Sequence, residues 1–252
     1  MIGHVVHGAG PARVLVLHGW LGDWSVFQAM TPALDPDAFT FAFLDVRGYG
    51  RSKDQAGPYD MATIASDAAA LADALGWETF AVVGHSMGGK AALRLAVDHP
   101  ARVERILALT PVWAAAAPFD APTRGLFFGA VQDRSLRAAI IDNTTGGRHP
   151  KAWSRAMAQR SAADSTDAAF EAYARSWIDD DFEAAARTIG QEVLVVVGRH
   201  DAGVTEDAAR ATWLAQLPSA RLEVLDGAGH YPMIETPLAL AGIFERFLSK
   251  DG

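Results

Sequence analysis

Cysteine is absent from the sequence, so no disulfide, thiolate metal ligand or cysteine nucleophile belongs to its chemistry. No apolar run approaches the roughly eighteen residues that a membrane-spanning helix needs. Residues 1–8 contain neither a basic segment nor a sustained apolar segment, which argues against a secretory signal peptide. We therefore expect a soluble, cytoplasmic protein without a membrane partner.

Positive charge is also scarce. Lys and Arg number 22 against 30 Asp and Glu, which leaves a formal net charge of -8. Such a balance repels phosphate backbones, so nucleic acid is not an expected partner. The 252 residues suit one large α/β domain, whose core is large enough to be stable without a metal. We expect neither a metal nor a cofactor, and a small molecule as the partner.

Apolar runs are present in a regular series, and most are continuous rather than alternating. Strands that are buried on both faces have this pattern, which indicates a largely parallel sheet with helices on each side. Residues 4–7 form a weaker run that we expect at the edge of the sheet. Helix signals fall between the runs, including capping positions at Asp60, Thr205 and Thr236. The expected fold is therefore a doubly wound, mostly parallel α/β sheet, with its main strands at residues 14–17, 39–44, 80–83, 106–109, 193–197 and 222–225.

The alternation of strands and helices stops between residues 112 and 188. This stretch is rich in alanine and has helical segments near residues 126–141, 153–161 and 168–177, with no strand-like run. Ligands bind at the carboxyl ends of the strands in open α/β folds. We therefore expect a core made of residues 1–111 and 189–252, and a helical cap, residues 112–188, over that end of the sheet.

The pattern Gly-His-Ser-Met-Gly lies between the run at residues 80–83 and a helix-forming segment. A buried strand that reverses into a helix within a few residues forces the central residue, Ser86, into a strained conformation and lifts its hydroxyl out of the turn. Glycines at positions 84 and 88 leave room, because a Cβ there would clash with the neighbouring strand and helix. The motif therefore predicts Ser86 as a nucleophile.

A serine hydroxyl stays protonated at neutral pH, so it needs a base, and the base needs a group that orients it. Among the eight histidines, His230 lies in a glycine-flanked loop that we expect to be mobile enough to carry the imidazole across the top of the sheet. Asp201 directly follows an apolar run and suits the acid. Asp226 is too near His230 in sequence to be the orienting acid and is expected at most as a partner behind it. His85 is expected to pack beside Ser86.

The turn His-Gly-Trp-Leu-Gly, residues 18–22, follows the first long strand. It can bring the backbone N–H of Trp20 opposite that of Met87, the residue after the serine. A backbone donor aimed at an oxyanion contributes about 3 kcal/mol in the transition state. We expect these two N–H groups to form an oxyanion hole, and His18 to stabilise the turn by hydrogen bonding.

On these residues the sequence resembles the α/β-hydrolase superfamily over nearly its whole length apart from the cap. The order of serine, acid and histidine is that of the family, and residues 45–52, Asp-Val-Arg-Gly-Tyr-Gly-Arg-Ser, resemble its structural turn after an early strand. The resemblance implies Ser86 as nucleophile, His230 as base, Asp201 as acid, and Trp20 and Met87 as backbone donors. The strand-to-helix turn at Ser86, Ser-Met-Gly-Gly, is called the elbow below. The elbow and the His-Gly-Trp turn are similar to those of small carboxylesterases and of the cofactor-free haloperoxidase or perhydrolase group.

We interpret the chain as a serine hydrolase that cleaves a carboxylic ester of a small, largely apolar substrate through an acyl-enzyme on Ser86. Epoxide hydrolases and haloalkane dehalogenases need a carboxylate at the elbow. The serine at position 86 therefore argues against both classes. Enol-lactone hydrolases and carbon-carbon hydrolases keep the same three residues, so they remain alternatives, as does a perhydrolase side activity. A ligand receptor that retains the triad is an alternative of another class.

The expected cap supplies many aromatic side chains that can line an apolar pocket or hold the cap together. Two basic residues of this segment, Arg124 and Arg148, could bind a substrate carboxylate, although a solvated position is the simpler interpretation. The aromatic residues are Trp113, Phe119, Phe127, Phe128, Trp153, Phe170, Tyr173, Trp177 and Phe182.

Overall fold

A sheet of seven strands forms the centre of the computed structural model, which describes residues 1–249. The strands lie in the order β1-β3-β2-β4-β5-β6-β7, and only β1 is antiparallel to its neighbour. This is the doubly wound, mostly parallel sheet that the apolar runs predict. The strands are β1 His4–His7, β2 Ala12–Leu17, β3 Phe39–Leu44, β4 Phe80–His85, β5 Val103–Leu109, β6 Glu192–Gly198 and β7 Ala220–Leu225.

The register of the central strands brings their carboxyl ends to one edge. Leu17 of β2 is level with Gly84 of β4, and His85 of β4 is level with Leu109 of β5. Every residue of β4 is buried, which explains its continuous apolar sequence. Residues that directly follow β2, β4, β5 and β6 therefore meet at the same edge of the sheet.

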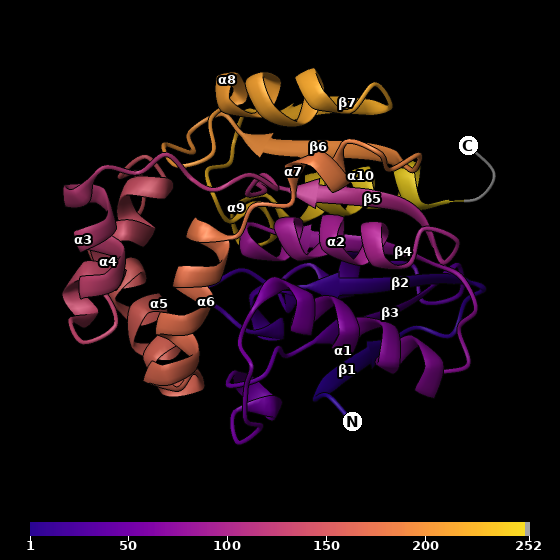
Figure 1. The fold of residues 1–252 in the computed structure, drawn as a ribbon, viewed down its shortest axis with the longest axis horizontal. Helices are drawn as coiled ribbons and strands as arrows, with labels where there is room; N and C mark the ends of the chain where they lie inside the picture. Colours follow the sequence, from indigo (N-terminus) through magenta and orange to yellow (C-terminus); the bar gives the residue numbers. More distant parts are fainter. Residues whose placement is uncertain (250–252) are drawn as a thin grey trace.

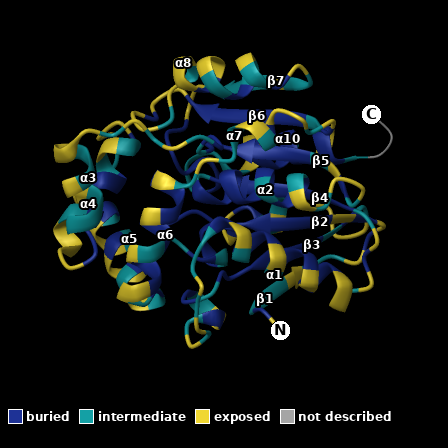
Figure 2. Cartoon of the chain, in the orientation of Figure 1, coloured by how far each residue is buried: buried dark blue, intermediate teal, exposed yellow. Residues whose placement is uncertain are grey.

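Helices cover both faces of the sheet. In Figure 1, α1 Met61–Ala74 and α2 Met87–Asp98 cross the near face, and α10 Pro237–Leu248 lies behind the strands. Asp60 caps α1 by accepting a hydrogen bond from the N–H of Thr63, as the sequence predicts. Figure 2 shows the strands buried and the outer helix surfaces exposed. None of the helices within residues 1–249 is long and apolar enough to cross a membrane.

Of the other two predicted caps, Thr236 does not act as predicted and Thr205 does. Thr236 precedes α10, but its hydroxyl donates to the carbonyl of Pro232 at 3.3 Å instead of capping the helix. That carbonyl belongs to the short helix α9 Pro232–Glu235, which the sequence pattern did not indicate. Thr205 does cap its helix, yet α8 Glu206–Ala209 passes into a π-helical turn over Arg210–Leu214 before the chain reaches β7.

Five helices lie between β5 and β6, and none of the seven strands comes from this segment. The helix expected near residues 126–141 is two helices, because the side chain of Asp133 caps the second by accepting a hydrogen bond from Ser135 N. In Figure 1, α3 to α6 lie together beyond the carboxyl ends of the strands. The helices are α3 Ala121–Gly129, α4 Arg134–Thr144, α5 Lys151–Asp164, α6 Asp167–Asp179 and α7 Glu183–Ala186.

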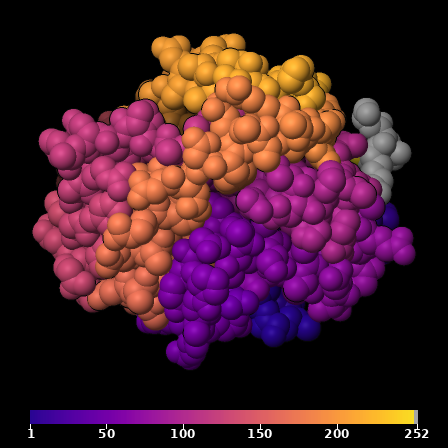
Figure 3. All heavy atoms as spheres, in the orientation of Figure 1, coloured from indigo at the N-terminus to yellow at the C-terminus, as the bar shows by residue number. Residues whose placement is uncertain are grey.

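The inserted helices are packed against the core rather than loosely attached, as Figure 3 shows. The ring of Trp20, in the loop after β2, stacks on Phe170 of α6 with centroids 4.0 Å apart. The indole N–H of Trp20 donates to the carbonyl of Phe170 at 2.7 Å. On the other side of Phe170, the buried guanidinium of Arg137 lies 3.5 Å from the ring centroid. This stack connects the loop after β2 directly to the insertion.

Candidate active site

Ser86 occupies the turn between β4 and α2 in a strained conformation, with φ 53° and ψ -117°. This is the conformation that the strand-to-helix motif predicts. The glycines on either side are required by close approach of backbone atoms. A Cβ on Gly84 would lie 2.2 Å from the carbonyl oxygen of Gly88, and one on Gly88 would lie 2.5 Å from that of Leu17.

Asp201 and His230 come from the loops after β6 and β7 and form a buried pair. The Nδ1–H of His230 donates to Oδ2 of Asp201 at 2.5 Å. The other carboxylate oxygen, Oδ1, accepts from the backbone N–H groups of Gly203 and Val204 at 2.8 and 3.0 Å. Both oxygens are therefore fixed, and the carboxylate holds the imidazole with Nδ1 protonated, which leaves Nε2 as the basic nitrogen.

Ser86 and His230 line one cavity of about 470 Å³. Asp201 is not part of its wall and lies behind the imidazole, only 3% exposed. The Ser86 hydroxyl has no hydrogen-bond partner within residues 1–249. The structure thus brings together the three side chains that the sequence reasoning selected, from three different loops at the carboxyl edge of the sheet.

The loop after β2 lies against the serine. A Cβ on Gly19 would lie 3.1 Å from Cβ of Ser86, so the next residue, Trp20, begins beside the nucleophile. Met87 is the first residue of α2, where unpaired N–H groups carry partial positive charge. Within residues 1–249, the backbone N–H groups of Trp20 and Met87 donate to no protein acceptor. Both predicted oxyanion donors are therefore at the elbow with free N–H groups.

The loop that carries His230, which was expected to be mobile, is hydrogen-bonded both to the core and to the insertion. The carbonyl oxygen of His230 accepts from Nε2–H of His85 at 2.8 Å and from the hydroxyl of Thr110 at 3.2 Å. Its N–H donates to the carbonyl of Thr144, in α4, at 3.1 Å. Burial holds the pKa of His85 well below its ordinary value, so His85 is a neutral donor at this position.

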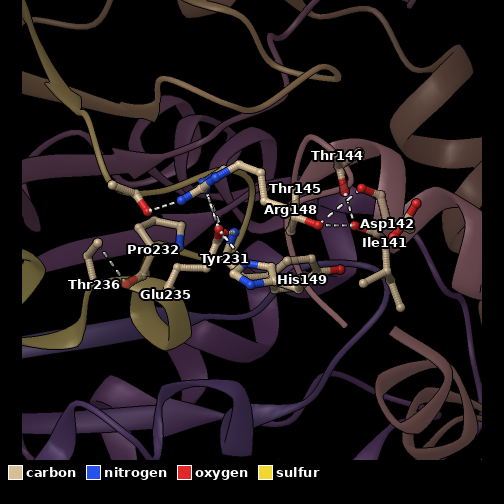
Figure 4. Close-up of polar contacts among 12 residues, drawn as sticks. Ile141, Asp142, Thr144, Thr145, Arg148, His149, Tyr231, Pro232, Glu235 and Thr236 are labelled. Atoms are coloured by element: carbon tan, nitrogen blue, oxygen red, sulfur yellow. Dashed lines mark hydrogen bonds and ion pairs between the residues drawn. The ribbon is translucent and has the colours of Figure 1, made fainter. Parts of the chain in front are cut away.

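The acidic residue that supports this loop is Glu235, and the sequence reasoning missed it. Its buried carboxylate accepts hydrogen bonds from the N–H groups of Gly229 and Tyr231, on either side of His230. Asp226, the partner expected behind His230, instead forms an exposed ion pair with Arg199. The only available signal was the position of Glu235 shortly after the histidine, which has no characteristic spacing. Figure 4 shows Glu235 within the surrounding polar contacts.

The aromatic residues of the insertion divide into two groups. Four of the nine expected candidates line the cavity, and the other five pack elsewhere. The basic candidates do not line it: Arg124 pairs with Asp179 at the surface, and Arg148 pairs with Glu235. The four aromatic side chains at the cavity wall are Trp113, Phe119, Phe127 and Trp177.

The motif at residues 45–52 ties loops together, as expected from its resemblance. The buried carboxylate of Asp45 accepts from the backbone N–H of Trp24 at 2.9 Å and from that of Arg51 at 3.0 Å. Arg47 forms a two-point ion pair with Asp67 of α1. His18 likewise stabilises its turn, because its Nε2 accepts the N–H of Val46 at 3.1 Å.

Comparisons with known proteins agree with this fold. The family model described as alpha/beta hydrolase fold matches residues 12–237. The pimeloyl-[acyl-carrier protein] methyl ester esterase of Nitrosomonas europaea is 29% identical, over 94% of this chain and 96% of the relative. The 2-hydroxymuconate semialdehyde hydrolase of Pseudomonas putida is also 29% identical, over 98% of this chain and 86% of the relative. The crystal structure of a bromoperoxidase from Bacillus anthracis has a TM-score of 0.88 at 19% identity, covering 97% of this chain and 94% of that one.

The sheet order, the strained serine turn and the helical insertion define an α/β protein with its site at the carboxyl ends of the strands. With the family model matching most of its length, the chain belongs to the α/β-hydrolase fold family. Its similarity to small esterases and to a bromoperoxidase is the one that the elbow and the turn at residues 18–22 indicate. The two full-length relatives are hydrolases. No group of three or more His, Cys, Asp or Glu within residues 1–249 is arranged to hold a metal ion.

Proposed function

We propose that this protein is a serine hydrolase that cleaves carboxylic esters of small, uncharged, largely apolar substrates. One observation carries the proposal. Ser86, held at φ 53° between β4 and α2, shares a cavity with His230. Nδ1–H of His230 donates to Asp201. A nucleophile, a base and an orienting carboxylate in this order are the requirements of acyl transfer through a serine.

In the proposed reaction, Nε2 of His230 takes the hydroxyl proton as Oγ of Ser86 attacks the ester carbonyl carbon. The carbonyl oxygen becomes an oxyanion and accepts hydrogen bonds from the N–H groups of Trp20 and Met87. The imidazolium, stabilised by Asp201, then donates its proton to the leaving alcohol, and the acyl group stays on Oγ. A water molecule gives a proton to His230 as its oxygen attacks the acyl carbon, and the imidazolium then returns that proton to Oγ of Ser86 as the acid leaves.

The cavity favours an uncharged, apolar substrate. Its wall is mostly aliphatic and aromatic, and none of the described residues that line it is Lys or Arg. Its one carboxylate, Glu183, is held by Nε1–H of Trp113 at 3.0 Å and by Arg187 at 3.1 Å. An anionic group buried there would have no cation to offset its desolvation. We propose that residues 112–188 act as the cap of this cavity, since they supply much of its lining.

Four other functions use the same residues. Carbon-carbon cleavage is suggested by the 2-hydroxymuconate semialdehyde hydrolase of Pseudomonas putida, but a muconate semialdehyde carries a carboxylate, for which the cavity wall offers no cation. Enol-lactone hydrolysis and a perhydrolase side activity need no further residue, because only the acyl donor or the nucleophile in deacylation changes. A triad-retaining receptor is opposed by the free hydroxyl at the cavity, which suits turnover.

Turnover of p-nitrophenyl butyrate by the wild-type protein and by Ser86→Ala tests the proposal. We expect the substitution to lower kcat by about 10³-fold or more and to leave the circular dichroism spectrum unchanged. Undiminished turnover in the variant would end the proposal. Methyl butyrate and γ-butyrolactone, measured in parallel, separate an esterase from a lactonase.

A further inference from the structure

A single buried carboxylate holds the backbone on both sides of His230. The N–H of Gly229 lies 3.0 Å from each carboxylate oxygen of Glu235, and the N–H of Tyr231 lies 3.0 Å from Oε1. The side chain of Glu235 is only 1% exposed. Hydrogen bonds from neutral donors to a buried carboxylate are among the stronger contacts in a protein, so the peptide groups that flank His230 have little freedom to rotate.

The same carboxylate is bound from the opposite side by the loop between α4 and α5. Nη1–H of Arg148 donates to Oε2 at 3.2 Å, and Nε2–H of His149 donates to the same oxygen at 2.8 Å. A second guanidinium nitrogen of Arg148 donates to the carbonyl of Gly227, in the loop before His230, at 3.0 Å. Figure 4 shows Arg148 and His149 reaching Glu235 across the boundary between the insertion and the core.

These contacts compensate the buried charge of Glu235. A buried carboxylate is costly unless a cation and further donors compensate it. Arg148 supplies the cation, and His149 supplies an additional donor. Glu235 itself is not part of the cavity wall, so it does not contact a bound substrate. Glu235 can therefore affect the reaction only indirectly, above all through the backbone of the His230 loop.

We propose that Glu235 is a positioning residue for His230, and that Arg148 and His149 of the insertion keep it in place. This inference rests on the proposed function, since it assigns a role in the same reaction. Fixing the peptide groups on both sides of His230 fixes where the imidazole meets Ser86. An error of about 1 Å in such a position can lower a rate by about 10²-fold. The insertion then has a second role beyond lining the cavity, which is to complete the support of the base.

The experiment compares Glu235→Gln and Arg148→Gln with the wild-type protein, using kcat and KM for p-nitrophenyl butyrate and the midpoint of thermal unfolding. Glutamine keeps the shape of Glu235, but its NH₂ group must face either the two loop amides or Arg148, and each of these is a donor. The matched control is Glu223→Gln, which removes an exposed carboxylate that also pairs with an arginine, Arg246, at 3.2 Å.

We expect Glu235→Gln to lower kcat by about 10 to 100-fold while KM stays within about twofold, because the substrate contacts are unchanged. Arg148→Gln should lower kcat by a smaller factor, and Glu223→Gln should leave kcat and KM as in the wild type. A folded Glu235→Gln protein with a lower unfolding midpoint and a wild-type kcat would overturn the proposal, because Glu235 would then be a stabilising residue only.

Arg148→Gln and labelling of the serine complete the test. If Glu235→Gln does not fold, Arg148→Gln carries the test, since Arg148 lies partly at the surface, and a wild-type kcat in that variant would contradict the proposal. Labelling of Ser86 by a fluorophosphonate separates this inference from the proposed function. Absence of labelling in the wild-type protein would refute the serine hydrolase itself, whereas normal wild-type labelling with a slower rate in Glu235→Gln supports the positioning role.

Discussion

At the scale of single residues, the two oxygens of Asp201 have separate tasks. Oδ2 accepts from His230, and Oδ1 accepts from Gly203 and Val204. The backbone donors prevent the carboxylate from rotating, and its burial excludes water from the contact with the imidazole. The orientation of His230, the proposed base, therefore depends on a carboxylate whose two oxygens are both bound.

Asp201→Asn is expected to keep the fold and to lower kcat for p-nitrophenyl butyrate by about 10² to 10⁴-fold. An asparagine can keep its oxygen toward Gly203 and Val204, but it then presents NH₂ to Nδ1 of His230. The imidazole must accept there, so its Nε2 is protonated and cannot take the proton from Ser86. Steady-state kinetics alongside near-UV circular dichroism checks this. A kcat within threefold of the wild type would show that Asp201 does not orient the base.

The residues that sequence reasoning selected and those it missed differ in how their roles are encoded. Ser86 belongs to a local motif, and Asp201 and His230 follow apolar runs, so their placement at the carboxyl edge is predictable. Glu235 and Lys90 carry no such local signal. Their roles depend on contacts with segments far away in the chain, including the carbonyl groups that surround Lys90.

At the scale of elements, the elbow depends on close contact between backbones. A Cβ on Gly88 of α2 would lie 2.5 Å from the carbonyl oxygen of Leu17 and 2.7 Å from that of His18. Both atoms belong to the backbone at the end of β2, where no side chain can rotate away. The same contact sets the distance between α2, which supplies Met87, and the turn that supplies Trp20.

Gly88→Ala is therefore expected to destabilise the fold by more than about 1 kcal/mol and to lower kcat. The matched control is Gly125→Ala, in the middle of α3, where an added Cβ meets nothing within 4 Å. That substitution should stabilise the protein by about 0.5 to 1 kcal/mol, since alanine favours a helix over glycine. Urea unfolding of both variants measures the difference. Equal stability of the two variants would contradict this account of the elbow.

The strands were predictable because burial on both faces produces continuous apolar runs, and all seven expected runs are strands of the sheet. The helices of the insertion were predictable in kind but not in their limits. The first of these helices ends at Gly129, and Asp133 caps the next, so the position of the break depends on a single capping side chain. The short helix α9 has only four residues, too few for a periodic pattern to reveal.

At the scale of the whole molecule, Lys90 joins the elbow helix to both ends of the insertion. Its fully buried ammonium group donates to the carbonyl oxygens of Ala115, Trp177 and Asp180 at 3.0, 3.1 and 2.6 Å. Burial lowers the pKa of Lys90 to about 8, although the nearby carboxylates, chiefly that of Asp180, oppose the shift. The chain thus enters and leaves the insertion next to one charged side chain.

The low pKa of Lys90 gives an expected dependence of stability on pH. An unfolded lysine has a pKa of about 10.4, so between about pH 8 and that value the unfolded state binds more protons. The contribution of Lys90 to the free energy of unfolding should therefore rise with pH across this window, by at most about 1.4 kcal/mol per pH unit. Below about pH 8 both states are protonated and the contribution is constant.

Urea unfolding of the wild-type protein and of Lys90→Met across this window measures the effect, with Lys151→Met, at an exposed lysine, as the control. The free energy of unfolding of the wild type minus that of Lys90→Met should increase with pH. A difference that stays constant, or that falls, would show that the Lys90 ammonium is not disfavoured in the folded protein.

The cavity, built from core and insertion together, gives an expected selectivity for uncharged esters. We expect kcat/KM for p-nitrophenyl butyrate to exceed that for mono-p-nitrophenyl glutarate, which adds a terminal carboxylate, by about 10²-fold or more. No Lys or Arg among the described residues lines the cavity to pair with that carboxylate. Comparable kcat/KM values for the two esters would contradict the proposed preference.

In the proposed reaction, Ser86 carries the acyl group between acylation and deacylation. Rapid acid quenching of the wild-type protein with p-nitrophenyl butyrate, followed by mass spectrometry of its peptides, tests this most directly. The result that we expect is one butyryl group on the peptide that contains Ser86, and none on the same peptide of Ser86→Ala. A butyryl group on another side chain, or continued turnover with no acylated peptide, would contradict the account.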